Sequence, residues 1–417
     1  MSKKIAFVIG SAAISGGTYV IFQHAMYLKK QGHQVTMICM SYDEYKNLQQ
    51  QQQPWHEGIH AFDFIAVEEA GSDHFDLVIF TWWKTIYHAP DVSGDNYLYF
   101  VQSIESRFYP VADKPLRRLV DKTYQISLPV ITEATWIKNY LRDKYQRQVH
   151  LVPNGARKDC YFEKGPVFAP REVGKLRVLV EGPLNVSFKN VEKTIDLCSR
   201  VSDIEVWLLS STLVKSYPGV NRVFSQVPVS ETAKIYRSCD VIVKLSYVEG
   251  MFGPPLEMFH CGGTAIVYDV TGHDEYIKNE VNGLVIRTDN EKAVVAAIEK
   301  LRDQPVFLRK LKDGALKTAG EWFDWEMSSR QFDAAVSDFM THGVTRVATK
   351  DLRDKTREYF STYEQEVKAS LNKFRLKAAL KNCLRPLFIK YPKLNILRSY
   401  VSSLGFLFHR LTRCVKG

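Results

Sequence analysis

Two glutamates and the short segment between them carry the strongest chemical pattern in the chain. Glu249 and Glu257 are eight positions apart, and glycines and the pair Pro254-Pro255 lie between them. The apolar run before Glu249 predicts a strand, and the run after Pro255 predicts a short helix. A helix that follows a glycine loop offers free N–H groups and its positive dipole end to an anion, and proline is well placed at its start. Carboxylates on either side can hold hydroxyl groups, so the pattern predicts a site for a sugar nucleotide.

A second glycine pair, Gly16-Gly17, lies near the amino terminus. It follows a predicted strand at 5–9 and precedes a predicted helix at 19–30 and a strand at 35–40, which makes a βαβ unit of a parallel sheet. The loop does not match Gly-x-Gly-x-x-Gly, which argues against a dinucleotide-binding oxidoreductase. Ligands of open α/β sheets bind beyond the carboxyl ends of the strands. We therefore expect the two glycine loops to face one cleft from opposite sides.

The pattern of strands and helices runs twice along the chain. The first series ends at Pro153-Asn154-Gly155, and residues 156–175, with prolines, glycines and mixed charges, predict a linker. A second series begins with a strand at 176–181 and ends with a helix at 325–340. We expect two doubly wound, Rossmann-like α/β domains at 1–155 and 176–342, followed by a helical tail at 343–417.

Composition limits the class of protein. Apolar residues make up 45% of the chain, and its seven cysteines are scattered without a Cys-x-x-Cys pair, which argues against a disulfide framework or a thiolate zinc site. The apolar run after Lys4 is interpreted as a first strand rather than a signal peptide. The sequence contains no run of 18 apolar residues, so we expect no membrane-spanning helix.

The net charge of +10 is concentrated in the tail. Residues 346–417 hold 17 Lys or Arg and 5 Asp or Glu, and no acidic residue follows Glu366. Residues 367–382 predict a helix with separate apolar and lysine stripes, Pro386 and Pro392 predict breaks, and an apolar repeat returns at 394–411. We expect residues 367–417 to lie on an anionic membrane surface; docking of the tail on the body is the alternative. The tail has no aromatic-interleaved module for RNA, so no nucleic acid is expected.

An ordered set of motifs connects the two glycine loops. Besides Gly16-Gly17, it comprises His24-x3-Leu28-x3-Gly32-His33-x-Val35, Val152-Pro153-Asn154-Gly155, Lys189-Asn190, Glu249-x7-Glu257, Gly262, Gly272-x2-Glu275-Tyr276-Ile277 and Asn282-Gly283-Leu284-Val285. Over about residues 3–342, the chain resembles the retaining family-4 glycosyltransferases of the GT-B fold. Residues 99–109 are similar to a segment of rhamnosyltransferase-like members.

The resemblance implies roles for individual residues. Glu249 would contact the hydroxyls of the donor sugar, Glu257 those of the ribose, and Lys189 would neutralise the diphosphate. Gly16 and Gly17 would let the backbone of the acceptor-side, N-terminal domain approach the diphosphate. The donor-side loop would also bind through Gly250, Met251, Phe252 and Gly253. The family forms its linkages with retention and without a metal or cofactor, and the absence of an Asp-x-Asp motif from the sequence agrees with that.

The sequence departs from the family pattern in three places. Pro183 stands where the family commonly has an arginine, and Lys215 or Arg222 could replace that cation. The usual Glu-Gly-Phe-Gly is stretched, which displaces Gly253 by one position. The first domain has no unambiguous catalytic histidine, since His24 has the spacing of a helix-packing residue. The candidates on the acceptor side are Trp82, Trp83, Gln102 and Glu105.

The sequence and the resemblance together predict a sugar transferase. The donor would be a nucleotide-diphosphate sugar and the acceptor a glycan or lipid-linked glycan of cell-surface polysaccharide synthesis. The expected location is cytoplasmic, peripheral at the inner face of the cell membrane. Two alternatives remain open at this stage: a nucleotide-sugar epimerase or phosphorylase on the same architecture, and a non-catalytic protein that only binds a sugar nucleotide or glycan.

Overall fold

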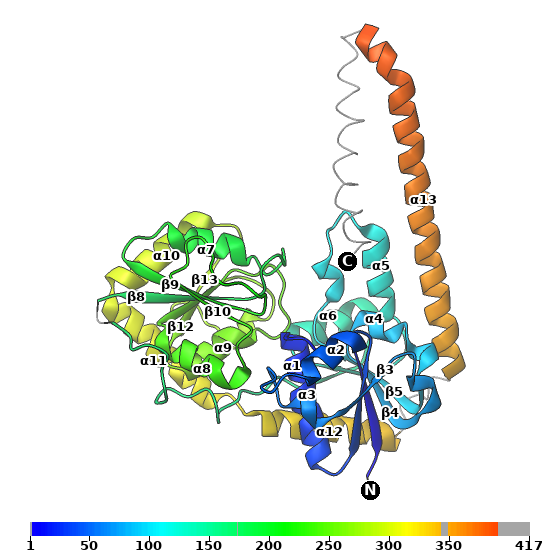
Figure 1. Ribbon diagram of the computed structural model, residues 1–417, viewed down its shortest axis with the longest axis horizontal. Helices are drawn as coiled ribbons and strands as arrows, with labels where there is room; N and C mark the ends of the chain where they lie inside the picture. The colour runs from blue at the N-terminus through cyan, green and yellow to red at the C-terminus, as the bar shows by residue number, and fades with distance from the viewer. Residues whose placement is uncertain (1, 173, 343–348, 391–417) are drawn as a thin grey trace.

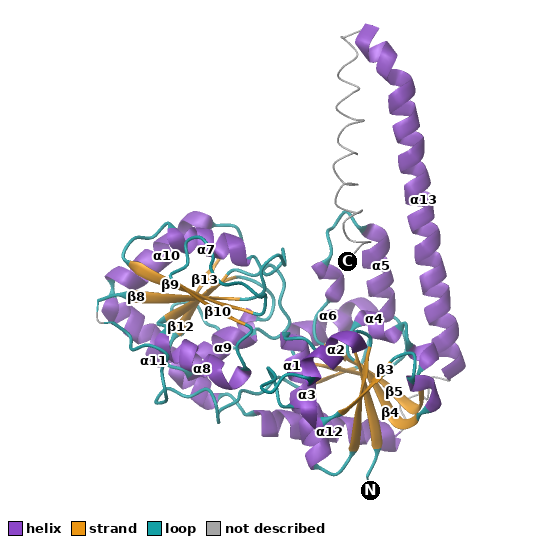
Figure 2. Cartoon of the chain, viewed as in Figure 1, coloured by secondary structure: helices purple, strands orange, loops and turns teal. Residues whose placement is uncertain are grey.

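The chain folds into two α/β domains and a long helix that projects from the first domain (Figure 1). The computed structural model describes residues 2–172, 174–342 and 349–390. Each domain contains one parallel sheet between layers of helices (Figure 2). This is the predicted architecture of two Rossmann-like domains.

The first sheet has seven strands in the order β3-β2-β1-β4-β5-β6-β7. Residues Ile5 to Ile9 of its central strand are fully buried, because alternate side chains enter two different cores on opposite faces of the sheet. The strands are β1 (Lys4–Ile9), β2 (Gln34–Cys39), β3 (Asp63–Ala66), β4 (His74–Phe80), β5 (Ser93–Val101), β6 (Val130–Thr132) and β7 (Val149–Leu151). The helices are α1 (Gly16–Lys30), α2 (Tyr42–Gln49), α3 (Gly58–Ala61), α4 (Trp83–Ile86), α5 (Lys114–Thr123) and α6 (Thr135–Tyr145).

The second sheet has six strands in the order β10-β9-β8-β11-β12-β13. Its strands are β8 (Leu176–Glu181), β9 (Ile204–Ser210), β10 (Arg222–Ser225), β11 (Val241–Lys244), β12 (Thr264–Tyr268) and β13 (Gly283–Ile286). Its helices are α7 (Val191–Ser199), α8 (Val229–Ser238), α9 (Gly253–His260), α10 (Glu291–Asp303) and α11 (Pro305–Glu321). In both sheets the strand order changes direction beside the first strand, which is where ligands of such folds bind.

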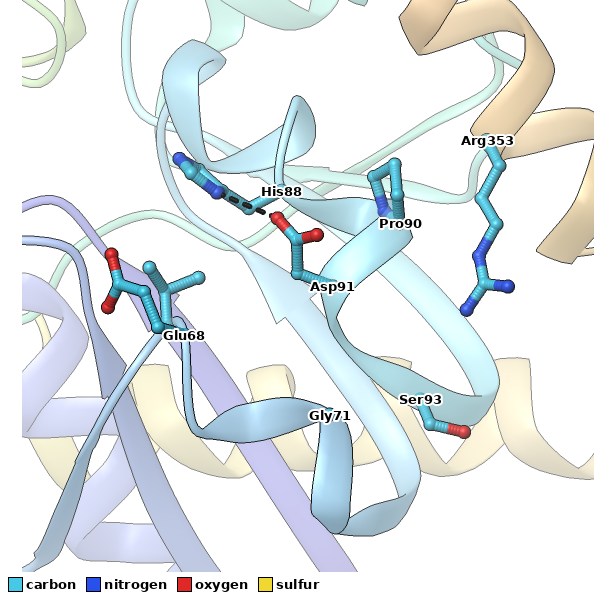
Figure 3. Close-up of a pocket in the computed structure, with 8 residues that line it drawn as sticks. Glu68, Gly71, His88, Pro90, Asp91, Ser93 and Arg353 are labelled. Carbon is cyan, nitrogen blue, oxygen red and sulfur yellow. Dashed lines mark hydrogen bonds and ion pairs between the residues drawn. The ribbon is translucent and has the colours of Figure 1, made fainter.

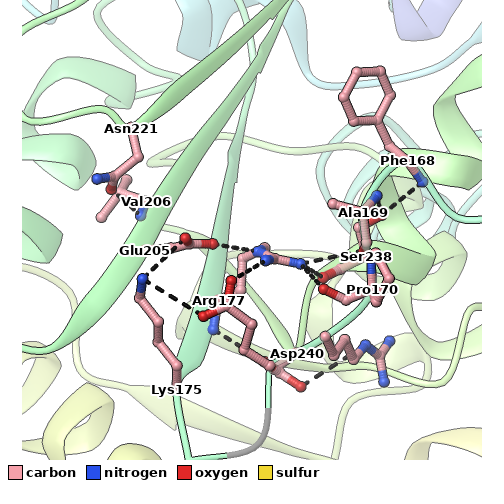
Figure 4. A network of polar contacts seen from close by, with 12 residues as sticks. Phe168, Ala169, Pro170, Lys175, Arg177, Glu205, Val206, Asn221, Ser238 and Asp240 are labelled. Atoms are coloured by element: carbon pink, nitrogen blue, oxygen red, sulfur yellow. Dashed lines mark hydrogen bonds and ion pairs between the residues drawn. The ribbon is translucent and has the colours of Figure 1, made fainter.

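A polar network fixes the segment between the domains to the second sheet. Arg177, at the start of β8, donates to the carbonyl oxygens of Ala169, Pro170 and Ser238 at 3.3, 3.0 and 2.8 Å. Its Nε donates to Glu205 at 2.5 Å (Figure 4). The segment predicted as a linker is therefore anchored at its carboxyl end, which fixes where the second domain begins.

The last helix of the second series returns to the first domain. Helix α12 (Trp325–His342) packs against α1, and Phe332 and Val336 enter the same core as Phe7. The buried His24 ring stacks on Phe332 and lies 3.0 Å from Ser329 Oγ, which is the packing role expected of that histidine. The sequence places residues 325–342 in the second domain, whereas their side chains complete the first.

The tail begins as helix α13 (Thr349–Lys390), which docks by its first turns and then leaves the body (Figure 1). Leu352 and Thr356 are buried, and Glu366 pairs with Arg118 of α5 at 2.9 Å. The predicted break at Pro386 is wrong, since α13 runs on to Lys390. A helix can lose one backbone hydrogen bond at a proline and continue when good helix formers surround it.

Part of the predicted tail lies outside the described residues. This applies to 343–348 and to 391–417, which include Pro392 and the apolar repeat at 394–411. No helix in the described part of the chain is long and apolar enough to cross a membrane.

Candidate functional site

Lys189 and Glu249 form an ion pair at the carboxyl end of the second sheet. Lys189 Nζ lies 2.8 and 3.0 Å from the two carboxylate oxygens. Asn190 holds the lysine loop in place, because its side-chain amide donates to the Leu245 carbonyl at 2.9 Å. Burial alone would raise the pKa of Glu249, but the charges of Lys189 and Lys244 hold that pKa below its usual value. Glu249 is therefore an ionised, buried carboxylate in neutral solution.

Glu257 is one turn into α9 and has a different environment. Burial raises the pKa of its carboxyl to about 7, although the hydroxyls of Tyr236 and Tyr161 lie against it. The charge of Glu181 raises this pKa further. The two glutamates of the motif thus share a domain, but the pKa of Glu249 is lowered and that of Glu257 is raised.

The start of α9 differs from the predicted anion site. The Gly253 N–H donates to the Met251 carbonyl at 3.0 Å, and Pro254 and Pro255 have no N–H. The Leu256 N–H faces the hydroxyl of Tyr276. The expectation of several free N–H groups is therefore wrong, and α9 can act on an anion mainly through its dipole.

The cation missing at Pro183 is not supplied by Arg222. The Arg222 guanidinium stacks on Phe168 and Trp207 at 4.6 and 5.4 Å, at the amino end of β10. Lys215 follows β9 and is exposed. A lysine that sequence reasoning missed, Lys244, lies at the carboxyl end of β11 among apolar residues. A charged residue inside an apolar strand was the available signal.

The first domain contributes its own glycine pair. Gly16 and Gly17 form the first turn of α1 rather than a loop, and the Ser15 hydroxyl caps that helix by accepting from the Thr18 N–H at 3.0 Å. Beyond its own helix and neighbours, a Cβ at Gly16 would meet no atom of the described chain within 4 Å. Gln102 lies beside this turn, with side-chain atoms 3.5 Å from a Cβ at Gly17. The backbone of this turn is therefore open to a close approach by a ligand.

The two domains meet at the loop that follows Glu249. A Cβ at Gly250 would lie 2.1 Å from the Gln102 carbonyl oxygen and 2.6 Å from Glu133 Oε1, so only glycine fits. Glu133 accepts from the Met251 N–H at 2.9 Å, and Trp136 donates its indole N–H to the Gly250 carbonyl at 2.9 Å. The structure thus brings Gln102 to the predicted donor loop.

Glu133 also reaches the crossing between the domains. Its second oxygen accepts from the side-chain amide of Asn154 at 2.9 Å, and burial raises the pKa of Glu133 to about 7. Sequence reasoning missed Glu133 and Trp136. The signal was weak: a carboxylate directly after a strand, with its partners 21 and 118 positions away.

Two of the acceptor-side candidates lie inside the first domain instead. Glu105 accepts from the Trp83 N–H at 2.8 Å and from the Tyr99 hydroxyl at 3.3 Å, and burial raises its pKa to about 8. Trp83 is buried and donates to the Tyr109 hydroxyl. Trp82 is half-buried against Gly10, with Lys84 over its ring at 4.8 Å. Of these three, Trp82 alone keeps an accessible surface.

Side chains 251 and 252 of the predicted donor loop face inward. Met251 and Phe252 are buried, and the Phe252 carbonyl accepts from the Tyr276 hydroxyl. Gly253 is open, since a Cβ there would meet no atom of the described chain within 4 Å outside its neighbours and helix backbone. What this loop can offer a ligand is therefore chiefly its backbone and the carboxylate of Glu249.

A cavity of about 500 Å³ lies elsewhere, near the amino ends of β4 and β5 (Figure 3). His88 and Asp91 pair at 3.1 Å on its wall, and Arg353 of α13 completes it. None of the residues predicted for the site lines it. In the described part of the chain, no group of three or more His, Cys, Asp or Glu side chains could hold a metal ion.

Part of the second domain matches a known protein family, and the predicted motif lies in the matched residues. Residues 214–318 match the family described as Glycosyl transferases group 1, and that segment contains both Glu249 and Glu257. The chitobiosyldiphosphodolichol beta-mannosyltransferase of Candida albicans is 25% identical over 154 residues, which are 36% of this chain and 30% of the relative. An uncharacterized glycosyltransferase of Methanocaldococcus jannaschii is 28% identical over 98 residues, 24% of this chain and 25% of that protein. The matched stretches span less than a third of either curated relative.

Solved structures resemble the chain over much more of its length. A sucrose-phosphate synthase from Thermosynechococcus elongatus superposes with a TM-score of 0.62 at 16% identity, over 81% of this chain and 99% of that one. Anabaena Alr3699/HepE in complex with UDP-glucose superposes with a TM-score of 0.63 at 13% identity, over 81% and 100%. The chain therefore has the GT-B fold, and its residues 214–318 match the glycosyl transferases group 1 family.

Proposed function

We propose that the chain is a glycosyltransferase that moves a sugar from a nucleotide-diphosphate donor to a hydroxyl of a glycan or lipid-linked glycan. The observation that carries this proposal is the ion pair of the partly exposed Lys189 with the buried Glu249, at the carboxyl end of the second sheet. The family segment that contains Glu249 and the GT-B fold support it. The Candida albicans relative is named as a mannosyltransferase, and the Anabaena structure contains UDP-glucose.

The proposed reaction exchanges one bond to the anomeric carbon of the sugar for another. The bond from this carbon to the diphosphate oxygen breaks, a bond to the acceptor oxygen forms, and the acceptor proton passes to the departing diphosphate. Negative charge grows on the diphosphate, and a preorganised cation such as Lys189 stabilises that charge without reorganising. Glu249 stays ionised beside it and can accept hydrogen bonds from the sugar hydroxyls. Glu257 is assigned to the ribose.

The first test is a thermal-shift screen with UDP-, GDP- and dTDP-sugars. Ligand at a hundred times its dissociation constant should stabilise the folded protein by roughly 2.7 kcal/mol. One base should stand out, because donor binding depends on a few specific contacts. If no nucleotide sugar shifted the melting temperature, the proposal would lose its substrate class. Incubation of the best donor without an acceptor then separates transfer from epimerisation, since an epimerase would isomerise the sugar.

Retention and metal independence are part of the proposal. Attack from the face that the diphosphate leaves would retain the configuration of the sugar, and lysine charges would take the place of a divalent cation. The name of the Candida albicans relative states a β-mannosyl product, so stereochemistry is a decisive readout. The anomeric coupling of the product in proton NMR measures it, and transfer in the presence of EDTA tests the metal. An inverted product, or loss of transfer with EDTA, would contradict these two parts.

The tail supports a location at the cytoplasmic face of a membrane. Between residues 367 and 390, α13 carries seven Lys or Arg and no Asp or Glu. Each basic residue near an anionic surface contributes about 1 kcal/mol. A lipid-linked acceptor of cell-surface polysaccharide synthesis would be within reach of such a protein.

Truncation after Glu366 tests the membrane proposal more sharply than removal of all of α13. Leu352 and Thr356 pack on the first domain, so removing them would disturb the fold. The truncated chain should lose sedimentation with vesicles of phosphatidylserine and phosphatidylcholine but keep donor binding. A second variant keeps the full length and changes Lys373, Lys377 and Lys381 to Gln. Its sedimentation with the vesicles should fall between that of the wild type and that of the truncated chain. Undiminished sedimentation of the truncated chain would remove the membrane from the proposal.

A non-catalytic binder is the second candidate, because two features favour it. The start of α9 offers few free N–H groups, and Pro183 replaces a cation of the family pattern. A site with too little positive charge would bind a sugar nucleotide and fail to help the diphosphate leave. Tight donor binding with neither transfer nor slow donor hydrolysis, across a panel of glycans, would favour this candidate over the transferase.

A further inference from the structure

Lys244 is a buried cation that no motif assigns. It is the last residue of β11, it follows the buried residues Val241 to Val243, and its side chain is 3% exposed. Its Nζ donates to Glu181 Oε2 at 2.5 Å and to the Glu181 carbonyl oxygen at 3.1 Å. Lysine is almost never buried to this extent unless it is paired. The pair therefore needs a reason to exist in the interior.

The surroundings of Lys244 are those of the proposed donor site. Burial alone would lower the pKa of Lys244, but the charges of Glu181, Glu249 and Glu257 raise it above its usual value. Gly182 follows Glu181 with a φ of +142°, and a Cβ there would lie 3.7 Å from Lys244 Nζ. That Cβ would also lie 2.9 Å from Val191 Cγ2, so the Gly182 backbone packs directly beside the ammonium. Among the described residues Nζ bonds only to Glu181, so one of its three N–H donors remains free.

Without Lys244, this region offers little positive charge to a diphosphate. Both oxygens of Glu249 already hold Lys189, and the N–H groups at the start of α9 are used or absent. Three carboxylates, Glu181, Glu249 and Glu257, lie close enough to act on Lys244. A diphosphate would add at least two negative charges to this group. Lys244 is the other cation that the sheet itself places there.

We propose that Lys244 is the second cation of the donor site, where its free N–H binds a diphosphate oxygen and Glu181 holds its ammonium in place. The inference rests on the proposed function. Lys244 would provide the positive charge that is missing at Pro183, where the family commonly has an arginine. Glu181 competes with the ligand for the ammonium, so the pair sets the affinity for the diphosphate as well as its position.

The rival explanation is an ion pair that serves packing alone. Removing one partner would leave a buried charge unpaired and destabilise the fold whatever its function. The informative variant therefore removes both charges together, as Glu181→Val with Lys244→Leu. Replacing a buried pair by apolar residues of similar volume is often neutral for stability. Glu181→Gln alone is the second variant, because it keeps Lys244 and a polar partner.

The experiment compares dissociation constants by calorimetry for full-length protein at one pH and salt concentration. The probes are the best of UDP, GDP and dTDP for the wild type, and the matching nucleoside. The double variant should bind the diphosphate about tenfold or more weakly, since a hydrogen bond to a charged group is lost. It should bind the nucleoside like the wild type. Glu181→Gln should bind the diphosphate more tightly than the wild type.

Each outcome decides something. Diphosphate affinity in the double variant within twofold of wild type would reduce the pair to packing and overturn the inference, with the proposed function untouched. If the double variant fails to fold by circular dichroism, unchanged or weaker diphosphate binding by Glu181→Gln overturns it in the same way. A wild type that binds none of the three diphosphates overturns the proposed function and this inference together.

Discussion

Glu249 in the second domain and Glu105 in the first are buried to nearly the same degree, at 6% and 4% exposure, yet they differ in charge. Lysines surround Glu249 and hold its pKa low. Glu105 has only neutral partners, an N–H and a hydroxyl, and burial raises its pKa to about 8. Burial alone therefore does not decide whether a carboxyl group is ionised; the charge of its partners does. Glu133, between the domains, is the intermediate case.

The largest effect expected from this difference is on the rate of sugar transfer. Glu249→Ala should lower the rate by about 10²–10³-fold, the usual result of removing a preorganised charged group from a polar site. Glu105→Gln should leave transfer within about twofold, because its amide can still accept the bonds from Trp83 and Tyr99. Initial rates at saturating donor measure both. A large loss with Glu105→Gln would mean that the first-domain carboxyl takes part in the chemistry.

Glu133 should give an effect of middle size. Glu133→Ala removes the contact to the Met251 N–H and should lower transfer about tenfold. Glu133→Gln can keep the contact to the Met251 N–H. The Asn154 side-chain oxygen has no partner among the described residues. If the Asn154 side-chain amide flips, this oxygen can accept a hydrogen bond from the new glutamine. Initial rates of transfer should be lower for Glu133→Ala than for Glu133→Gln. Equal losses in both would show that the charge of Glu133, and not the contact, is what matters.

The smallest effect is on stability and depends on pH. The folded pKa of Glu105, about 8, exceeds its ordinary 4.5, so the folded chain holds a proton that the unfolded chain loses between these values. The contribution of Glu105 to stability therefore falls as pH rises from 4.5 to 8. Glu105→Gln should melt above the wild type at pH 8.5, by roughly 2–4 °C for each kcal/mol recovered. The difference should vanish at pH 5, and a difference independent of pH would refute the assignment.

Much of the fold could be predicted because buried parallel strands are apolar throughout. The strand at 176–181 was predicted with the bounds of β8, and the pattern of two α/β series is confirmed. The edge strands β3, β10 and β13 were missed, since runs of only four residues give little pattern. The packing of α12 on the first domain was also not predicted, because the sequence of an amphipathic helix does not indicate which domain its apolar face contacts.

The site could be predicted only in part. Motif spacing brought out Lys189 and Glu249, and the structure joins them directly. Lys244 and Glu133 were missed, because their significance depends on partners 63 and 118 positions away. Glu105 and Trp83 follow strands of the predicted sheet, as ligand-binding residues often do, but turn into the core. Position at a strand end places a side chain near an edge of the sheet and does not decide which way it points.

Donor binding by a Lys189→Met variant tests the central claim most directly. Lys193→Met is the matched control, because Lys193 is four positions along and pairs with Asp289 and Glu291 near the surface, where such pairs contribute little. Calorimetry with the best nucleotide sugar should show at least tenfold weaker binding for Lys189→Met and wild-type binding for Lys193→Met. Equal affinities in all three proteins would contradict the assignment of the Lys189–Glu249 pair to the donor site.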